Sequence, residues 1–401
     1  MVENIDHLKT WQKIESQYYM QVVNRLPVVL VMGKGTLVWD SNSNKYLDFT
    51  SGWAVLNLGH SHPVVTEAIH EQSKKIMQMT NLYYTIPQLG LAKILADNSC
   101  YDRVFFANSG AEANEGACKL ARKWGRETLD GAYEIITANN SFHGRTMAMM
   151  AATGQKHYQE EWEPLMPGFI NVDYNNFEQL VENATEKTCA VLLEVVQGEG
   201  GVNVPDQNYL LKVQKWCQQN NILFMVDEVQ TGMGRLGTLF GYQKFGLDPD
   251  VMVLGKALGA GVPLGAFLCK ERFSVLSPGD HGSTFGGNAL TTAAGWASAK
   301  YIIETDLPAE AAKSGKYLHS MLDVIKERHD IESVRGFGLL LGLELKKNKS
   351  QAVIERCLSK GLLLNAVRPN VIRFFPPLNV SEGEMNQAVK ILEEALEEEK
   401  I

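Results

Sequence analysis

A lysine and an aspartate each follow a run of apolar residues, where charged side chains are uncommon. Lys256 stands just after the run 251–254, and Asp227 stands directly after the run 222–226. A lysine in an apolar setting tends toward a lowered pKa, so its amine can form a Schiff base with a carbonyl carbon. In the alternative interpretation, the Lys256 amine reaches solvent or pairs in a salt bridge. A carboxylate that closes a buried strand is costly unless a cation pairs with it. The two residues therefore predict an amine nucleophile and an anion for a bound cation.

Two loops that follow other apolar runs contain residues suited to an anion and to an aromatic ring. Ser109, Gly110 and Ala111 follow the run 103–107 and begin a predicted helix, whose free backbone N–H groups can bind a phosphate. Phe142 and Arg145 follow the run 134–138, where the ring can stack on a ligand and the guanidinium can bind a carboxylate. Taken alone, the first loop is better explained as a helix N-cap, and the second as a surface loop.

The four features fit one cofactor. Pyridoxal 5'-phosphate (PLP) needs a phosphate site, a stacking residue, an anion for its pyridine nitrogen and a nucleophilic lysine. Four unrelated explanations, each at the end of a strand, are less economical than one shared site. We therefore predict PLP as the cofactor and Lys256 as the residue that forms the Schiff base.

Two other motifs match nucleotide-binding patterns only in part. Residues 232–237 read G-x-G-x-x-G, but several residues separate them from the preceding strand, and no long helix is predicted after them. Gly255 and Lys256 do not complete a P-loop, because Asp250 replaces a required glycine and Ala257 replaces the Ser or Thr. We expect neither type of nucleotide site.

The candidate residues can form one site only if the carboxyl ends of their strands lie at the same edge of a sheet. The predicted strands are residues 103–107, 134–138, 189–195, 222–226, 251–254 and 264–269. They are nearly continuous in apolar residues and alternate with helical patterns, which is typical of a mostly parallel sheet covered on both faces. In such α/β sheets ligands bind beyond the carboxyl ends of the strands, where the candidate residues stand.

The last hundred residues have a different pattern, which predicts a smaller α+β domain. Two helices are predicted from apolar faces, one formed by Leu318, Met321, Leu322 and Ile325, and one by Met385, Ala388, Val389, Leu392 and Leu396. Ser381 and Glu384 can form a capping box at the start of the second. We predict an N-terminal segment (1–50) that packs on the small domain, a large PLP-binding domain (51–295) and a small C-terminal domain (296–401).

The composition is that of an ordinary globular enzyme, with 45% apolar and 21% charged residues in 401. The net charge of -8 argues against a nucleic-acid partner or an anionic membrane surface, which need a basic patch. No apolar run is long enough to span a bilayer, and residues 1–10 have no apolar leader segment. Six scattered cysteines favour reduced thiols in a cytoplasmic protein over disulfides or a metal site.

At this point the motifs resemble a known family. Residues 57–63, 108–115, 141–146, 197–201, 227–237, 255–256, 281–288 and 372–377 are similar, in this order, to the class III (ornithine/acetylornithine-type) aminotransferases. The resemblance covers nearly the whole chain. It implies the PLP fold type I, transamination of a small-molecule amino donor with 2-oxoglutarate and glutamate as the second pair, and a homodimer with active sites shared between subunits.

The resemblance also implies roles for single residues. Gly110 and Ala111 bind the phosphate, together with Thr284 of the second subunit. Phe142 and Val229 cover the two ring faces, Asp227 pairs with the ring nitrogen, and Gln230 reaches the ring O3′. Arg145 and Ser283 contact the substrate; Arg373 binds an α-carboxylate and pairs with Glu199 when that carboxylate is absent.

Within the family, residues 81–84 and 364–373 are most similar to the acetylornithine branch. This implies transamination of N2-acetylornithine in arginine biosynthesis. Trp53 lies at the substrate entrance, where the ornithine enzymes carry Tyr and the acetylornithine enzymes usually carry Ile. Ornithine, 4-aminobutyrate, succinylornithine and acetyl-lysine-type donors remain alternatives, as does a PLP-fold protein retained only for binding.

Overall fold

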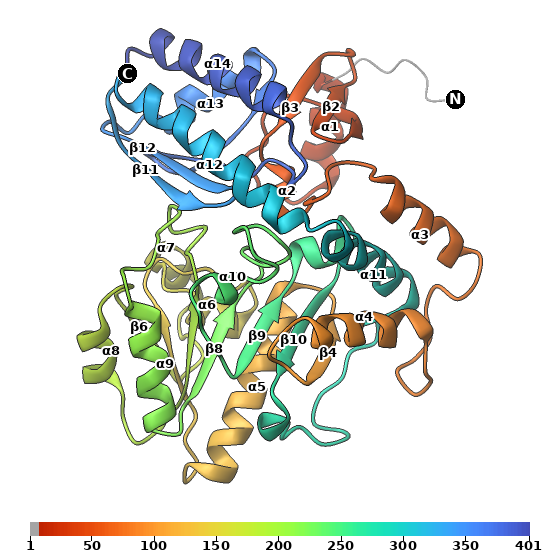
Figure 1. Ribbon diagram of the computed structural model, residues 1–401, viewed down its shortest axis with the longest axis vertical. Helices are drawn as coiled ribbons and strands as arrows, with labels where there is room; N and C mark the ends of the chain where they lie inside the picture. The colour runs from red at the N-terminus through yellow and green to blue at the C-terminus, as the bar shows by residue number, and fades with distance from the viewer. Residues whose placement is uncertain (1–7) are drawn as a thin grey trace.

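The computed structural model describes residues 8–401. A seven-stranded sheet forms the centre of the larger part of the molecule (Figure 1), in the order β4-β10-β9-β8-β7-β5-β6. Its strands are β4 Arg103–Ala107, β5 Glu134–Ala138, β6 Phe169–Val172, β7 Thr188–Glu194, β8 Leu223–Asp227, β9 Val251–Leu254 and β10 Gly265–Cys269. β10 runs antiparallel to β4 and β9, and the other neighbouring strands of this sheet pair in parallel. The predicted, mostly parallel α/β sheet is confirmed.

The strand predictions hold closely. β4, β5 and β9 have the predicted bounds, and β7, β8 and β10 are each displaced at one or both ends by a single residue. β6 was not predicted, because it is a four-residue edge strand that contains Asn171 and is only partly buried. A short edge strand with a polar residue lacks the continuous apolar run that marks the central strands.

Alternate residues of each strand pack into two separate cores, one on each face of the sheet. In β8, Phe224 and Val226 belong to one core, and Leu223 and Met225 to the other. The first core contains side chains of α4 and α9, and the second contains those of α5 and α6. This two-sided burial explains why the strands are apolar at every position. The helices of this part are α3 Pro63–Ser73, α4 Ile86–Asp97, α5 Gly110–Thr128, α6 Met147–Ala152, α7 Lys156–Gln159, α8 Phe177–Asn183, α9 Tyr209–Gln219, α10 Gly241–Lys244 and α11 Ala289–Glu304.

A smaller C-terminal part lies beside one end of the large sheet (Figure 1). It contains the antiparallel sheet β11-β12-β15-β14 and three helices. Its elements are α12 Leu307–Lys326, β11 Ile331–Phe337, β12 Leu340–Leu345, α13 Ser350–Ser359, β13 Leu362–Leu363, β14 Asn365–Arg368, β15 Val371–Phe374 and α14 Glu382–Glu398. Both predicted helices are present, and the Ser381–Glu384 capping box is formed at the start of α14.

The N-terminal segment joins this smaller part through a shared sheet. Its elements are α1 Leu8–Tyr18, β1 Leu30–Lys34, β2 Leu37–Asp40, β3 Lys45–Asp48 and the short turn α2 Ser51–Ala54. β3 pairs in parallel with β13, so residues more than 300 positions apart share backbone hydrogen bonds. The domain boundaries at residues 50 and 295 remain a prediction. The predicted lack of a leader segment falls mainly on residues 1–7, which lie outside the described residues. Within residues 8–401, no helix combines the length and apolar character needed to span a bilayer.

The G-x-G-x-x-G motif forms a series of turns between β8 and the four-residue helix α10, so it opens no long helix. Its arginine, Arg235, is completely buried. The guanidinium donates to Leu339 O at 3.0 Å, to Pro376 O at 2.6 Å and to Asn57 Oδ1 at 2.5 Å. Burial lowers the pKa of Arg235 to about 9. The motif thus serves to join the large sheet, the C-terminal part and the segment around Asn57.

Replacing Arg235 should therefore destabilise the whole molecule. Arg235→Met leaves three buried oxygens without a donor, and we expect a loss of roughly 3 kcal/mol of unfolding free energy. Urea denaturation measures this loss. The matched control is Arg328→Met, whose exposed guanidinium pairs with Glu393 at 2.9 Å; it should cost less than about 1 kcal/mol. Equal urea midpoints for the two variants would show that the hydrogen bonds of Arg235 do no more than offset the free-energy cost of desolvating its guanidinium.

Candidate active site

Nine of the predicted residues line one cavity of about 250 Å³ next to the carboxyl ends of β5, β7, β8 and β9. The lining residues are Gly110, Ala111, Asn114, Phe142, His143, Gly144, Arg145, Glu194, Glu199, Asp227, Val229, Gln230 and Lys256. They come from strand ends and from the first turn of α5. The prediction that these distant segments meet at one edge of the sheet is confirmed.

The first turn of α5 lies where the sequence predicts an anion site. Ser109 is the N-cap, and its Oγ accepts a hydrogen bond from Glu112 N at 3.1 Å. The N–H groups of Gly110 and Ala111 precede the first intrahelical hydrogen bonds, so they are free to bind an anion. A Cβ on Gly110 would lie 2.8 Å from the Val229 side chain, so only glycine keeps this end of the helix close to the cavity wall.

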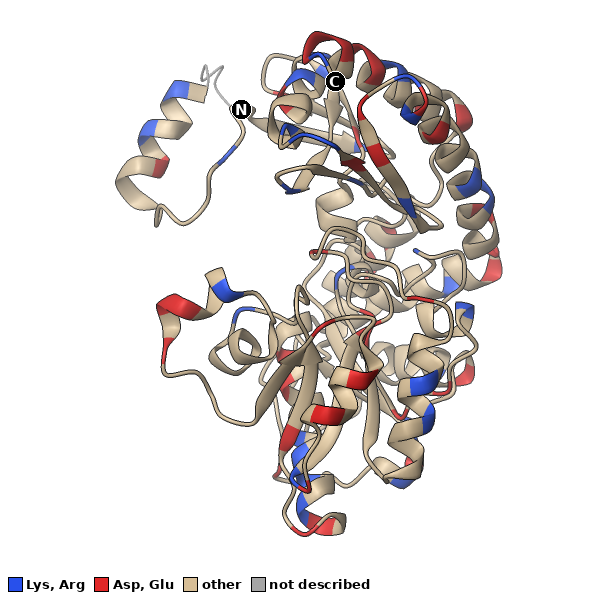
Figure 2. Ribbon diagram, turned by 90° about the vertical axis from the view of Figure 1, so that its left-hand side faces the viewer, with Lys and Arg blue, Asp and Glu red and all other residues tan. Residues whose placement is uncertain are grey.

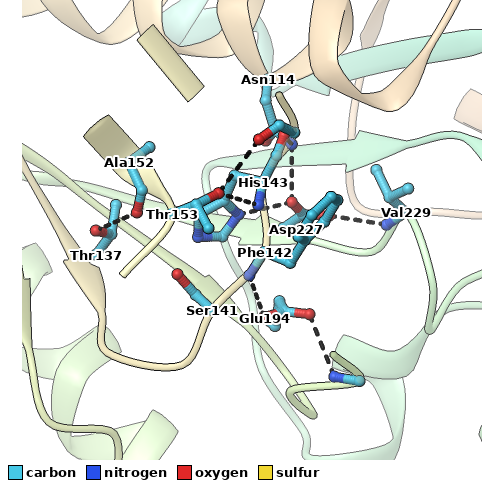
Figure 3. A network of polar contacts seen from close by, with 12 residues as sticks. Asn114, Thr137, Ser141, Phe142, His143, Ala152, Thr153, Glu194, Asp227 and Val229 are labelled. Carbon is cyan, nitrogen blue, oxygen red and sulfur yellow. Dashed lines mark hydrogen bonds and ion pairs between the residues drawn. The ribbon is translucent and has the colours of Figure 1, made fainter. Parts of the chain in front are cut away.

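The carboxylate of Asp227 is buried, and both of its oxygens are hydrogen-bonded (Figure 3). His143 Nδ1 and Asn114 Nδ2 each lie 2.8 Å from Oδ2, and Val229 N donates to Oδ1 at 2.9 Å. These contacts fix the direction of the carboxylate within the cavity. The neighbouring Glu228 takes the opposite direction, where it accepts the N–H groups of Gly241 and Tyr242. Successive residues of an extended strand point to opposite faces, which explains this division.

Lys256 follows β9 with a backbone φ of 42°, in the left-handed region that residues with a Cβ rarely adopt. Such strain is characteristic of functional sites. Burial lowers the pKa of the Lys256 amine, against the opposing effect of the Glu199 carboxylate. The residue therefore combines a fixed backbone with an amine that loses its proton more easily than an exposed lysine, as the sequence predicted.

Glu199, Arg373 and Gln230 form a second polar group of the site. Arg373 Nη1 lies 2.8 Å from Glu199 Oε1, and Gln230 Nε2 donates to the same oxygen at 3.2 Å. Arg373 is completely buried, and its other donor reaches Asn365 Oδ1 at 2.8 Å. Burial alone would raise the pKa of Glu199, but Arg373 and Lys256 hold it below its ordinary value. The expected pairing of Glu199 with Arg373 is present.

Phe142 and Arg145 share one loop at the mouth of the cavity. The backbone N–H of Phe142 donates to Glu194 Oε2 at 3.1 Å. Arg145 is exposed, donates to Tyr158 Oη at 3.0 Å and lies 4.5 Å from the centre of the Tyr158 ring. Tyr158 thus orients a guanidinium that is otherwise free to bind a carboxylate.

Three predicted residues stand apart from this cavity. Thr284 is exposed on the loop before α11, and Ser283 on the same loop accepts from Asn108 Nδ2 at 3.1 Å. Trp53 is 59% exposed and belongs to a turn in which Ser51, Gly52, Trp53 and Ala54 all have positive φ. The roles of these residues, and of the cavity residues toward a ligand, remain predictions.

Four cavity residues were not singled out from the sequence: Asn114, His143, Gly144 and Glu194. Asn114 stands one helical turn after Gly110, so helix periodicity indicated the same face. His143 follows Phe142 directly, and Glu194 is the last residue of β7. A carboxylate that ends a buried strand was the signal used for Asp227, and it applies equally to Glu194. Burial, reinforced by Asp227, raises the pKa of Glu194 well above its ordinary value.

The residues present fit PLP. Among the described residues, His143 Nε2 and Asn114 Oδ1 are buried polar atoms without a hydrogen-bond partner, and both side chains line the cavity. Asp227 offers an anion for a ring nitrogen, Phe142 and Val229 offer two apolar faces, and the first turn of α5 offers N–H groups for a phosphate. Lys256 supplies the amine.

The chain is similar to known proteins along nearly its whole length. The family profile described as "Aminotransferase class-III" matches residues 18–396. The acetylornithine aminotransferase of Caldanaerobacter subterraneus is 47% identical over 96% of this chain and 98% of its own length. That of Methanocaldococcus jannaschii is 46% identical over 97% and 98%. Among solved structures, an ornithine aminotransferase of Toxoplasma gondii has a TM-score of 0.95 and 33% identity over 98% and 96% of the two chains, and it is described with partial occupancy of PLP at its active site. An acetylornithine aminotransferase of Elizabethkingia anophelis has a TM-score of 0.87 and 33% identity over 98% and 100%.

The network around Asp227 predicts a large effect of a small change. Asp227→Asn keeps the shape but removes the negative charge, so a protonated ring nitrogen loses its partner. We expect turnover to fall by about 100-fold or more, while PLP affinity, measured by fluorescence titration, changes far less. The control is Asp323→Asn, which removes the carboxylate that His319 contacts on the surface. Wild-type turnover in Asp227→Asn would show that Asp227 holds no such proton.

Proposed function

The chain belongs to the class III aminotransferases, and from this premise we propose that it transfers the terminal amine of N2-acetylornithine to 2-oxoglutarate with PLP as cofactor. The products are N-acetylglutamate 5-semialdehyde and glutamate, as arginine biosynthesis requires. The observation that carries the reaction type is one cavity that contains both Lys256 and Asp227, next to the Glu199–Arg373 pair. The choice of donor is supported by the acetylornithine aminotransferases that are 46–47% identical to this chain.

Each residue of the cavity has a task in this proposal. PLP, when bound, withdraws electrons from the carbon that carries the reacting amine. Asp227 keeps a proton on the ring nitrogen, and Lys256 takes the proton from the donor carbon. Gly110 and Ala111 hold the phosphate through their backbone N–H groups. Phe142 and Val229 exclude water from the two ring faces, and Gln230 is proposed to reach the ring O3′.

The two substrates carry their carboxylates at different distances from the reacting carbon, so different residues must bind them. The acetylornithine α-carboxylate is far from its terminal amine, and Arg145, Ser283 and Trp53 are proposed to receive that end of the substrate. Glutamate carries a carboxylate on the reacting carbon, and Arg373 is proposed to bind it. Glu199 neutralises Arg373 during the first half-reaction and releases it in the second.

The surface around Thr284 supports a homodimer with shared active sites. The neighbouring residues include large apolar side chains that are strongly exposed in the single chain: Leu82 at 87%, Tyr84 at 93%, Ile86 at 79% and Phe285 at 60%. An apolar surface of this kind is typical of a subunit interface. The helix α1 also has exposed apolar residues, and none of its residues is buried. It lies apart from the rest of the ribbon (Figure 2). We propose that a second copy covers this surface and receives Thr284 at its phosphate site.

The proposed location is the cytoplasm. All six cysteines are free thiols, and five of them are buried. Free thiols persist in a reducing compartment, whereas an oxidising one favours disulfides. The substrates are small, charged metabolites, and we propose no nucleic-acid or membrane partner.

The donor assignment is tested with a panel of donors at a fixed concentration of 2-oxoglutarate. We expect the highest kcat/KM for N2-acetylornithine among acetylornithine, ornithine, 4-aminobutyrate, succinylornithine and acetyl-lysine. A higher value for another donor would keep the aminotransferase and overturn this substrate. No turnover with any donor, together with retained PLP binding, would favour the binding-protein alternative.

Lys256→Ala tests the chemistry independently of the donor. The variant lacks the nucleophile and the base, so kcat should fall by about 10³-fold or more. After borohydride reduction, mass spectrometry should find PLP attached to the wild-type peptide that contains residue 256 and to no peptide of the variant. The control Lys300→Ala removes an exposed amine of α11 that pairs with Glu304. PLP attached to another lysine in both proteins would contradict the assignment.

Glu199→Ala tests the proposed switch at Arg373. The variant leaves Arg373 permanently free, so the half-reaction with the terminal-amine donor should slow by about 10-fold. The half-reaction with glutamate should keep its rate or become faster. Single-turnover absorbance measurements separate the two. Equal slowing of both half-reactions would show that the Glu199–Arg373 pair is only structural.

A further inference from the structure

The segment that carries Glu199, residues 198–202, is called the gate loop here. Its three glycines favour a flexible segment when only the sequence is considered. In the structure the loop is closed at its base, where Gln197 and Asn203 each donate a backbone hydrogen bond of 3.0 Å to the other. Gly198 N also donates to Glu194 Oε1 at 3.3 Å. The loop is therefore fastened at both ends.

The glycines make room for close neighbours. A Cβ on Gly198 would lie 1.4 Å from Gln230 Oε1, and a Cβ on Gly200 would lie 2.7 Å from Asn140 O. A side chain at position 198 would have to displace the Gln230 side chain, which binds Glu199, and a side chain at position 200 would require the backbone to move. These two glycines thus indicate a packed loop and not a flexible one.

Two arginines of the C-terminal part hold the carbonyl oxygens of the gate loop. Arg335, on β11, donates through Nη2 to Gly201 O at 2.7 Å and through Nε to Val202 O at 3.1 Å. Arg368, on β14, donates through Nε to Gly200 O at 3.2 Å. Three successive carbonyl groups after Glu199 are therefore bound by guanidinium groups from outside the large sheet.

Arg368 differs from most arginines of the chain in its partners. No carboxylate pairs with it among residues 8–401, and its second hydrogen bond goes to Asn140 Oδ1 at 3.2 Å. Asn140 stands two residues before Phe142, so Arg368 joins the gate loop to the loop of the proposed ring-stacking residue. Arg335, by contrast, also pairs with Glu344.

Arg368 and Arg373 stand on the two strands of one β-hairpin, β14–β15, and both contact the gate loop. Asn365 pairs with Arg373 across β14 and β15, and Arg368 pairs with Val371. Arg368 holds the backbone of the loop, while Arg373 binds the Glu199 carboxylate at 2.8 Å. A shift of this hairpin would therefore move both contacts together.

We infer that Arg335 and Arg368 are positioning residues for the Glu199–Arg373 switch. They fix the gate-loop backbone, so Arg373 is released by rotation of the Glu199 side chain while the loop remains in place. The hydrogen bonds of Arg335 and Arg368 go to the gate-loop backbone, to Asn140 and to residues of the C-terminal part, so each acts through the loop and not on the substrate. A fixed backbone returns the Glu199 carboxylate to Arg373 after each glutamate leaves. The inference deepens the proposed function and rests on it for its kinetic consequence.

The first test measures the loop itself and needs no substrate. In hydrogen–deuterium exchange of the PLP-loaded enzyme, Arg368→Met should raise the exchange rate of the amides in residues 198–202 by about 10-fold, because a hydrogen bond to a charged donor is lost. Arg335→Met, which frees two carbonyl groups, should raise it at least as much. Arg368→Lys keeps the charge and one hydrogen bond, so it should restore part of the protection.

The second test measures the switch. Arg368→Met should slow the single-turnover half-reaction with acetylornithine by about 10-fold and leave the half-reaction with glutamate nearly unchanged, since a displaced Glu199 leaves Arg373 free. Arg356→Met is the matched control. Its guanidinium pairs with Glu399 at 2.9 Å on the outer helices of the same part of the molecule. The control should change neither the exchange of residues 198–202 nor either half-reaction.

Two outcomes would overturn the inference. One is wild-type exchange of residues 198–202 in both Arg335→Met and Arg368→Met. The other is faster exchange with equal slowing of both half-reactions, which would show that the arginines support the fold without acting on the switch. An error in the proposed donor can be told apart from an error in this inference. In that case the wild-type enzyme would be inactive with acetylornithine, while the faster amide exchange of residues 198–202 in the arginine variants would still be observed.

Discussion

The buried carboxylate of Asp227 is the constraint on which the site depends. A charge at the end of a strand covered on both faces is costly unless its oxygens are bound, and three donors bind them: His143, Asn114 and Val229. Each donor comes from a different place, namely the loop after β5, the first turns of α5 and the backbone after β8. Satisfying one carboxylate therefore brings three segments together around the cavity. Of the residues that face PLP in the proposal, Phe142 precedes the donor His143 in the sequence, and Val229 is itself a donor.

Positive and negative groups are interleaved across the cavity. Asp227, Glu194 and Glu199 supply carboxyl groups, and Lys256 and Arg373 supply cations. Burial lowers the pKa of Arg373, and burial alone would raise that of Glu199, each toward the neutral form. The two groups oppose this effect because they face each other. Removing either partner leaves an uncompensated charge in a buried place. A substrate carboxylate that replaces Glu199 restores the balance, which is the physical basis for a switch at this position.

Sequence alone predicted the strands and the residues at their ends, because local apolar runs and the rule of carboxyl-end binding suffice for both. It did not predict the contacts of Arg235, Arg335 and Arg368. Each of these arginines donates to carbonyl oxygens more than 100 positions away, and no local pattern marks such a partner. The gate loop shows the same limit. Its glycines indicated flexibility, whereas close approach of Gln230 and Asn140 is what requires them.

One aromatic ring connects Arg373, the proposed carboxylate-binding residue, to the rest of the fold. Arg373 lies 4.3 Å and Arg235 lies 5.8 Å from the centre of the Phe375 ring, so two buried guanidinium groups share it. The backbone of Phe375 is bound on both sides by the N-terminal segment: its N–H donates to Phe49 O at 2.7 Å, and its carbonyl accepts from Ser51 Oγ at 2.5 Å. Ser51 begins the left-handed turn that presents Trp53. The position of Arg373 and that of the proposed entrance residue are therefore set by one packed unit, because a shift of Phe375 would disturb both.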